Sequence, residues 1–261
     1  MSAVRTAPSE GPVVREEALR IEGLSKFFGG VRVLEDISFE ATVGERLAII
    51  GPNGAGKTTL LNLINGQLEP TRGRIVYFGR DITSLPTHTR ALSGQSRSFQ
   101  IPSLLRELTV FENTMLVMHG LRKSRLSMIR RSTDYEDVVS NAREALEDFA
   151  LWDKRDEIVG RLSYGDQRRL EIDLCMATRP RMLLLDEPSN GLTREEGASI
   201  IEMINERIGD DVTVLIVAHD MHFIFSVADR VLVLADGSIL ICDECDVVRC
   251  DDRVREIYMG G

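Results

Sequence analysis

The chain has 261 residues, of which 43% are hydrophobic and 28% are charged, and its formal net charge at pH 7 is −9. This length suits one large α/β domain with an inserted lobe. The acidic balance argues against nucleic acid as a partner, because a surface that binds nucleic acid is basic. No apolar run approaches the roughly 18 residues needed to cross a membrane. The N-terminus also lacks the apolar region typical of a secretory signal.

The first residues, 1–17, mix Ser, Ala, Pro, Glu and Gly without periodicity, and we expect them to form a flexible tail. Strands are expected at 18–24 and 36–41, where polar and apolar residues alternate. Between them lies Phe28, just before a pair of glycines. An aromatic ring at this place suits either the stacking of an adenine ring or the core of a hairpin, and the residues alone favour the hairpin.

Residues 51–59 read Gly-Pro-Asn-Gly-Ala-Gly-Lys-Thr-Thr, which fits the phosphate-binding loop pattern. The apolar run 46–50 predicts a buried strand before the loop, and 59–64 predicts a helix after it. In that context, backbone N–H groups and the helix N-terminus hold phosphate oxygens. Lys57 would reach the β- and γ-phosphates, and the Thr58 hydroxyl would bind Mg²⁺. We therefore expect a nucleoside triphosphate to bind along the whole loop: Gly51, Pro52, Asn53, Gly54, Ala55, Gly56, Lys57, Thr58 and Thr59.

After a further strand at 74–78, residues 98–102 form a short extended segment that ends at a proline. Gln100 on this segment would contact Mg²⁺ or the attacking water and sense the γ-phosphate. From about 104 to 160, β-branched runs give way to helical periodicity, which we interpret as a helical lobe inserted into the α/β core. A buried stripe is predicted there because apolar residues recur at three- and four-residue steps: Val139, Ala142, Leu146 and Phe149.

Basic residues gather within 122–131 of this lobe. A solvated helix face is the usual explanation for such a run, and proximity to an anionic membrane surface is the alternative.

Apolar strands are expected at 181–185 and 212–218, with a helix between them, which is the alternation typical of a parallel sheet. Such sheets bind ligands at the carboxyl ends of their strands. Asp186 and Glu187 follow the first of these strands and His219 follows the second. We therefore expect Asp186 to bind Mg²⁺, Glu187 to act as general base, and His219 to orient or switch the reaction at the γ-phosphate.

The last part of the chain predicts a hairpin that turns at Asp236 and Gly237, followed by a short helix. Cys242 and Cys245 have the spacing of metal ligands, but no second cysteine pair or histidine cluster follows them. We interpret them as reduced thiols and assign no metal to them.

Over residues 18–261 this set of motifs resembles the ATP-binding subunits of ABC transporters. The decisive segment is Leu-Ser-Tyr-Gly-Asp-Gln at 162–167, which resembles the ABC signature and precedes Asp186 in the usual order. The resemblance implies a P-loop NTPase core with a RecA-like parallel sheet, an antiparallel β subdomain and an inserted α-helical subdomain. The helical subdomain would span about 104–178, and a C-terminal extension about 243–261.

The resemblance further implies a head-to-tail dimer of identical or paralogous ATPase subunits that holds ATP and Mg²⁺ at its interface. Phe28 would stack on adenine, and Ser163 and Gly165 would reach the γ-phosphate from the opposite subunit. The residues acting on the first side of each ATP would be Lys57, Thr58, Gln100, Asp186, Glu187 and His219. Membrane permease subunits would contact the helical lobe and the Gln100 segment at the cytoplasmic face of the inner membrane. A solute-binding protein would act indirectly.

A finer resemblance, carried by residues 109–113, 164–172 and 254–260, is to the group serving branched-chain amino acid uptake and the similar urea and amide systems. Two alternatives of another class remain: a soluble ABC ATPase for protein or iron–sulphur assembly, and a regulatory role with slow hydrolysis. The chain departs from the family pattern at Asp166, Thr193 and Ala218. Asp166 adds a negative charge to the signature, and Thr193 stands where an aspartate commonly helps to couple the two sites.

Overall fold

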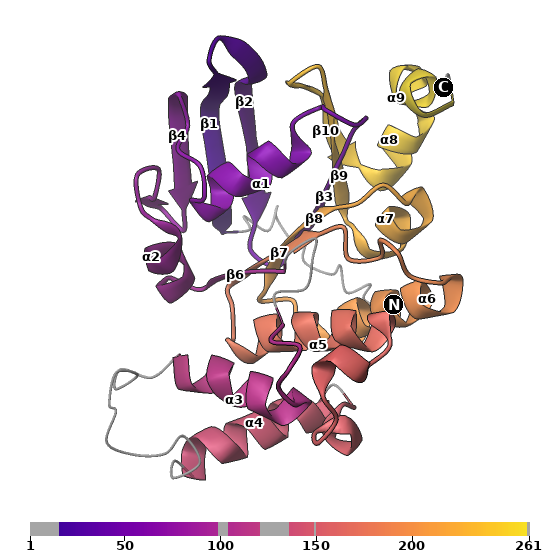
Figure 1. Cartoon of the computed structure of the whole chain (residues 1–261). Helices are drawn as coiled ribbons and strands as arrows, with labels where there is room; N and C mark the ends of the chain where they lie inside the picture. Colours follow the sequence, from indigo (N-terminus) through magenta and orange to yellow (C-terminus); the bar gives the residue numbers. More distant parts are fainter. Residues whose placement is uncertain (1–15, 99–103, 121–135, 149, 260–261) are drawn as a thin grey trace, which may run out of the picture.

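The computed structural model describes residues 16–98, 104–120, 136–148 and 150–259. Two sheets lie above a group of helices in Figure 1. Within the described residues, one sheet has six strands in the order β10-β9-β3-β8-β7-β6, and the other has four in the order β2-β1-β4-β5. The strands of the larger sheet are β3 (Arg46–Ile50), β6 (Gln95–Arg97), β7 (Met182–Asp186), β8 (Thr213–Val217), β9 (Arg230–Ala235) and β10 (Ser238–Glu244).

The larger sheet is parallel from β6 to β9, and β10 joins β9 in an antiparallel hairpin. Alternate residues of its central strands face different cores: in β3, Leu47 and Ile49 face one, and Ala48 and Ile50 face the other. Because both faces are covered, these strands read as continuous apolar runs. The strands predicted at 46–50, 181–185 and 212–218 are confirmed with almost the same bounds.

The smaller sheet is antiparallel and consists of β1 (Glu17–Phe28), β2 (Val31–Thr42), β4 (Arg72–Tyr77) and β5 (Arg80–Asp81). Its first two strands are longer than predicted because the chain turns only at Gly29 and Gly30. These glycines have φ of 52° and 93°, a conformation that glycine adopts without strain. Phe28 therefore belongs to a strand end. Together, the parallel sheet, the antiparallel sheet and the helical part confirm the predicted fold class.

The described part of the chain contains α1 (Lys57–Asn65), α2 (Thr87–Leu92), α3 (Val110–Gly120), α4 (Glu136–Asp148), α5 (Tyr164–Ala177), α6 (Arg194–Arg207), α7 (Met221–Val227), α8 (Cys245–Cys250) and α9 (Asp252–Met259), with 3-10 turns at Trp152–Lys154 and Val159–Arg161. In Figure 1, α3, α4 and α5 pack together below the sheets. No helix in this described part is long and apolar enough to span a bilayer. The sequence did not predict α2, α7 or α8, because such short helices hold too little of a periodic pattern.

The buried stripe of α4 consists of Val138, Ala142, Ala145 and Leu146. The predicted stripe was wrong at its start, because Val139 is only half-buried and its neighbour Val138 faces the core. Phe149, Gln100, the basic run 122–131 and residues 1–15 lie outside the described residues.

Arg90 fastens the C-terminal end of α1 to the segment that follows β5. The last carbonyls of a helix have no partner within it, and Arg90 Nη1 donates to those of Leu63 and Ile64, both at 2.7 Å. The same guanidinium donates to the carbonyls of Thr83 and Leu85. Burial lowers the pKa of Arg90 to about 10. This value is still well above neutral pH, so the guanidinium stays charged. Arg90 therefore fixes the helix that follows the phosphate-binding loop.

We expect Arg90→Met to lower the free energy of unfolding by about 3 kcal/mol, because it leaves buried carbonyls without donors. Urea unfolding followed by circular dichroism measures this change. Arg74→Met is the matched control, since Arg74 pairs with Glu22 at the surface, and we expect its midpoint to equal that of the wild type. A urea midpoint of Arg90→Met equal to that of Arg74→Met would contradict the claim that Arg90 stabilises the end of α1.

Candidate functional site

The loop between β3 and α1 is packed against the backbone of neighbouring strands. Gly51, Gly54 and Gly56 have φ of 154°, 83° and 101°, which favours glycine. A Cβ on Gly56 would lie 2.6 Å from Leu34 Cδ2, and a Cβ on Gly51 would lie 2.2 Å from the carbonyl oxygen of Leu234. The loop therefore has no room for side chains where it touches β2 and β9, and only glycine allows this close approach.

The N-terminus of α1 suits an anion. Gly56 caps it without a side-chain hydrogen bond, so no side chain competes for the N–H groups of its first turn. Lys57 is buried, and its Nζ donates to the carbonyls of Gly51 at 2.7 Å and Pro52 at 2.9 Å. Burial lowers the pKa of Lys57, while the charges of Glu187 and Asp186 act in the opposite direction. A loop of glycines, helix N–H groups and a lysine fits a polyphosphate, and Thr58, exposed beside Lys57, fits its cation.

The carboxyl ends of β7 and β8 bring Glu187 and His219 together. Glu187 Oε1 lies 2.7 Å from His219 Nε2, and its Oε2 accepts a hydrogen bond from Asn190 Nδ2 at 3.0 Å. Its backbone has φ of 49°, the left-handed conformation, and its N–H donates to the carbonyl of Val217 at 2.7 Å. A non-glycine residue held in this conformation is a feature concentrated at functional sites. The structure thus fixes the Glu187 carboxylate at both oxygens, facing the strand end that carries His219.

Asp186 is buried at the end of β7, where Arg97 Nη2 lies 2.8 Å from its Oδ2. Arg97 is not predicted from the sequence, because a basic residue at the end of an unrecognised short strand gives no pattern. Gln100, predicted as a third oxygen ligand for Mg²⁺, lies outside the described residues. Carboxylate and hydroxyl oxygens such as those of Asp186 and Thr58 are the ligands that Mg²⁺ prefers.

A second buried arginine, Arg168 on α5, holds the backbone beneath these carboxylates. Its Nη2 donates to the carbonyls of Asp186 and Glu187, both at 2.7 Å, and its Nη1 donates to Glu171 Oε2 at 2.6 Å. From the sequence, Arg168 is predicted only to lie on a helix, because a single charged residue on an amphipathic helix is usually solvent-facing.

The segment that resembles the ABC signature begins α5. Ser163 caps the helix: its Oγ accepts from the Asp166 N–H at 3.0 Å and donates to Asp166 Oδ2 at 2.9 Å. Lys154 Nζ lies 2.5 Å from the same carboxylate oxygen. Burial acts to raise the pKa of Asp166, but the hydrogen bonds from Lys154 and Ser163 outweigh it and hold the pKa below its ordinary value. The negative charge that Asp166 adds to the signature is therefore paired with Lys154.

Gly165 is buried against α6, where a Cβ would meet Glu196 Oε1 at 2.6 Å. In Figure 1, α1 lies beside the four-stranded sheet and α5 lies beside α3 and α4. Ser163 and Lys57 thus belong to different parts of the molecule.

Phe28 is 44% exposed, so its ring is not the hairpin core that the residues alone favoured. Phe28 pairs with Val31 in the sheet. The carbonyl of Val33, in the same hairpin, would lie 3.0 Å from a Cβ on Gly56, so this hairpin packs closely against the phosphate-binding loop. The exposed ring is thus carried by the hairpin that packs against the phosphate-binding loop.

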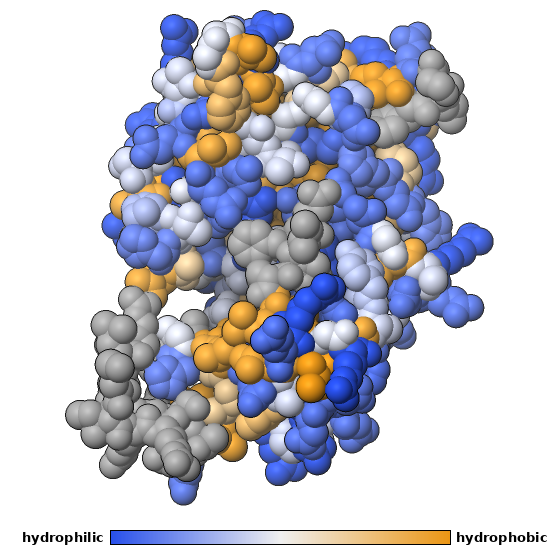
Figure 2. Space-filling model, in the orientation of Figure 1, coloured by the Kyte–Doolittle hydropathy of each residue, from blue (hydrophilic) through white to orange (hydrophobic). Residues whose placement is uncertain are grey.

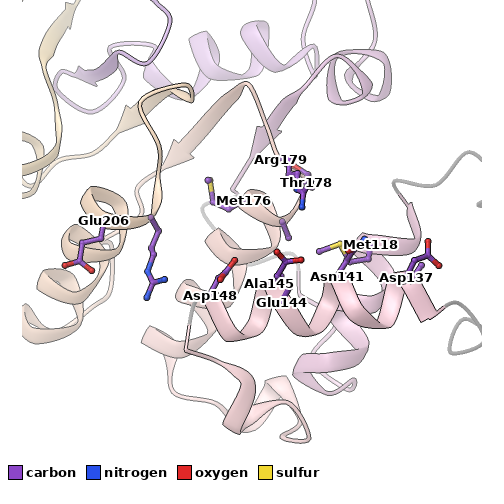
Figure 3. Close-up of a pocket in the computed structure, with 13 residues that line it drawn as sticks. Met118, Asp137, Asn141, Glu144, Ala145, Asp148, Met176, Thr178, Arg179 and Glu206 are labelled. Atoms are coloured by element: carbon purple, nitrogen blue, oxygen red, sulfur yellow. The ribbon is translucent and has the colours of Figure 1, made fainter.

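Two of the hollows in the described part of the chain involve α3, α4 and α5. One of about 610 Å³ opens between α4 and the ends of α5 and α6, and Figure 3 shows acidic side chains such as Asp137, Glu144 and Glu206 around it. None of its lining residues belongs to the loop 51–59. The other, of about 270 Å³, lies between β6, α3 and α5 and is lined by Leu105, Leu116 and other residues.

The sequence model of a family described as "ABC transporter" matches residues 34–190. The chain is 36% identical over 248 residues to the high-affinity branched-chain amino acid transport ATP-binding protein LivG of Salmonella typhimurium, covering 93% of this chain and 97% of that protein. It is 33% identical over 242 residues to the lipopolysaccharide export system ATP-binding protein LptB of Haemophilus influenzae, with coverage of 93% and 97%. The crystal structure of the ADP conformation of MJ1267, an ATP-binding cassette of an ABC transporter, aligns with a TM-score of 0.84 and 32% identity, covering 94% of this chain and 99% of that one.

We expect Glu187→Gln to keep ATP affinity and to lower the rate of hydrolysis about 100-fold or more, because general base catalysis contributes this much. Phosphate release measures the rate, and a fluorescent ATP analogue measures affinity. Glu202→Gln is the control, since Glu202 is an exposed acid on α6. A Glu187→Gln protein that hydrolyses ATP as fast as the wild type would rule out Glu187 as the base.

Proposed function

The chain belongs to the ABC transporter family, and on this premise we propose that it is an ATP-binding subunit that drives the import of branched-chain amino acids. It is an ATPase that converts ATP and water to ADP and phosphate. The single observation that supports the solute is the identity to LivG, which extends over 93% of the chain. The identity to LptB is lower and concerns export, and the group of urea and amide importers is the nearest alternative.

We assign the reaction to the edge where β3, β7 and β8 end. The loop 51–59 would hold the phosphates, Lys57 would reach the β- and γ-phosphates, and the exposed ring of Phe28 would stack on adenine. Thr58, Asp186 and Gln100 would bind Mg²⁺, which supplies neutralising charge to the phosphates. Glu187 accepts the proton of the attacking water. Because His219 Nε2 lies 2.7 Å from Glu187 Oε1, His219 orients this carboxylate, and it would respond to the γ-phosphate when ATP is bound.

A second ATP-binding subunit completes the site. Ser163 and Gly165 are the residues that would reach the ATP of a partner, because they are carried by α5, away from the loop of their own chain. The partner is an identical chain or, as we favour, a paralogue. Since Lys154 neutralises Asp166, the departure from the usual signature residue does not place an unpaired charge beside the partner's phosphate.

Permease subunits would dock on the helical part, at the cytoplasmic face of the inner membrane. The hollow between β6, α3 and α5 supports this proposal, because Leu105 and Leu116 at its rim are 52% and 51% exposed. Figure 2 shows apolar side chains gathered on this lower, helical part of the visible face. A solute-binding protein would deliver the solute to the permease and act on this chain indirectly.

The test is isolation of the tagged Glu187→Gln chain from detergent-solubilised native membranes with Mg-ATP. We expect polytopic membrane subunits and a second ATPase to co-purify. Recovery of soluble partners alone would contradict the importer and favour an assembly ATPase.

The same complex with the wild-type chain, reconstituted in proteoliposomes with its binding protein, then tests the solute. We expect leucine to stimulate ATP hydrolysis and to be taken up, and urea and short amides to do neither. Stimulation by urea instead of leucine would keep the importer and overturn the amino-acid assignment. Lys57→Ala is the control for uptake that does not depend on this subunit.

A further inference from the structure

A buried ion pair joins β6 to the end of β7. Arg97 Nη2 lies 2.8 Å from Asp186 Oδ2, and their side chains are only 6% and 3% exposed. Because water is excluded, the loss of either partner would leave an uncompensated buried charge, which is strongly unfavourable. The pair therefore fixes the orientation of the Asp186 carboxylate.

The same guanidinium is held from the other side by α1 and the turn that follows it. Arg97 Nη1 donates to Asn62 Oδ1 at 2.6 Å and to Gln67 Oε1 at 2.9 Å. The planar fork of an arginine makes such divergent bonds in fixed directions, which the single ammonium of a lysine does not reproduce. Arg97 is thus a rigid bridge between α1 and β7.

These two elements carry the oxygens assigned to Mg²⁺. Thr58 lies in the first turn of α1, and Asp186 ends β7. The bridge engages Oδ2 of Asp186, and we assign Oδ1 to the cation. Because ligand positions must be held closely for the octahedral geometry of Mg²⁺, the distance between helix and strand decides how well the cation binds.

We propose that Arg97 is a positioning residue for Mg²⁺, which sets the separation of Thr58 and Asp186 by tying α1 to β7. The inference rests on the proposed assignment of these two residues as ligands. The opposite possibility is that Arg97 competes with Mg²⁺ for the Asp186 carboxylate, since both are cations. The two readings predict opposite changes in Mg²⁺ affinity when Arg97 is removed.

The test is a Mg²⁺ titration of the binding of a fluorescent ATP analogue to the full chain, together with its binding in EDTA. For Arg97→Met we expect about tenfold more Mg²⁺ at half-saturation, the usual effect of losing a group that orients a metal ligand. Binding in EDTA stays at the wild-type value, because the loop 51–59 is unchanged. Arg97→Lys restores part of the loss, since its ammonium reaches Asp186 but not both anchors on the α1 side.

Asn62→Ala is the second variant, which keeps both buried charges and removes one anchor. We expect it to weaken Mg²⁺ binding in the same direction by a smaller factor, so the proposal stays testable if Arg97→Met fails to fold. Tighter Mg²⁺ binding in Arg97→Met would make Arg97 a competitor and overturn the proposal. Unchanged Mg²⁺ binding in both variants would also overturn it. A wild-type chain whose ATP binding ignores Mg²⁺ would instead refute the ligand assignment itself.

Discussion

The guanidinium of Arg168 holds the backbone on which the proposed hydrolytic carboxylates stand. It is wholly buried and donates to the carbonyls of both Asp186 and Glu187. Hydrogen bonds from a charged donor are stronger than neutral ones, and more so where water is excluded. They stabilise a turn in which Glu187 adopts a left-handed conformation. Without these hydrogen bonds, the backbone that carries the Glu187 carboxylate, which contacts His219 and Asn190, would no longer be held in place.

Arg168 also connects the signature segment to the carboxylate edge within one chain. It lies on α5, the helix that Ser163 caps. One side chain therefore joins the helix that follows the signature segment to the carboxylate edge.

Three buried arginines share this kind of role in the described part of the chain. Arg90 connects the end of α1 to the segment after β5, Arg97 connects α1 to β7, and Arg168 connects α5 to β7. Burial of a charge is unfavourable unless its donors find acceptors. Each of these arginines donates to acceptors on two elements: Arg90 and Arg168 bond backbone carbonyls, and Arg97 bonds side-chain amide and carboxylate oxygens.

The sequence predicted the parts of the site that follow from local pattern. Lys57 comes from a loop motif, and Asp186, Glu187 and His219 come from the rule that ligands bind at the ends of parallel strands. It missed Arg97 and Arg168, because a lone charge within a short strand or an amphipathic helix gives the same pattern as a solvent-facing residue. Lys154 was missed because its pairing with Asp166 depends on a 3-10 turn, which is too short to give a periodic pattern in the sequence. The residues alone favoured a hairpin core for Phe28, because sequence does not show where a hairpin ends relative to its sheet, and adenine stacking was expected only from the family resemblance.

The most direct test of this account is the kinetics of Arg168→Lys, which keeps the buried charge but cannot hold several carbonyls at once. We expect kcat to fall by about tenfold or more, while the affinity for ATP stays within about twofold, since only the carboxylate edge loses its support. Hydrogen exchange should quicken at the amides of Glu187, Ser189 and Asn190. An Arg168→Lys protein with wild-type kcat and wild-type exchange in this segment would contradict the account.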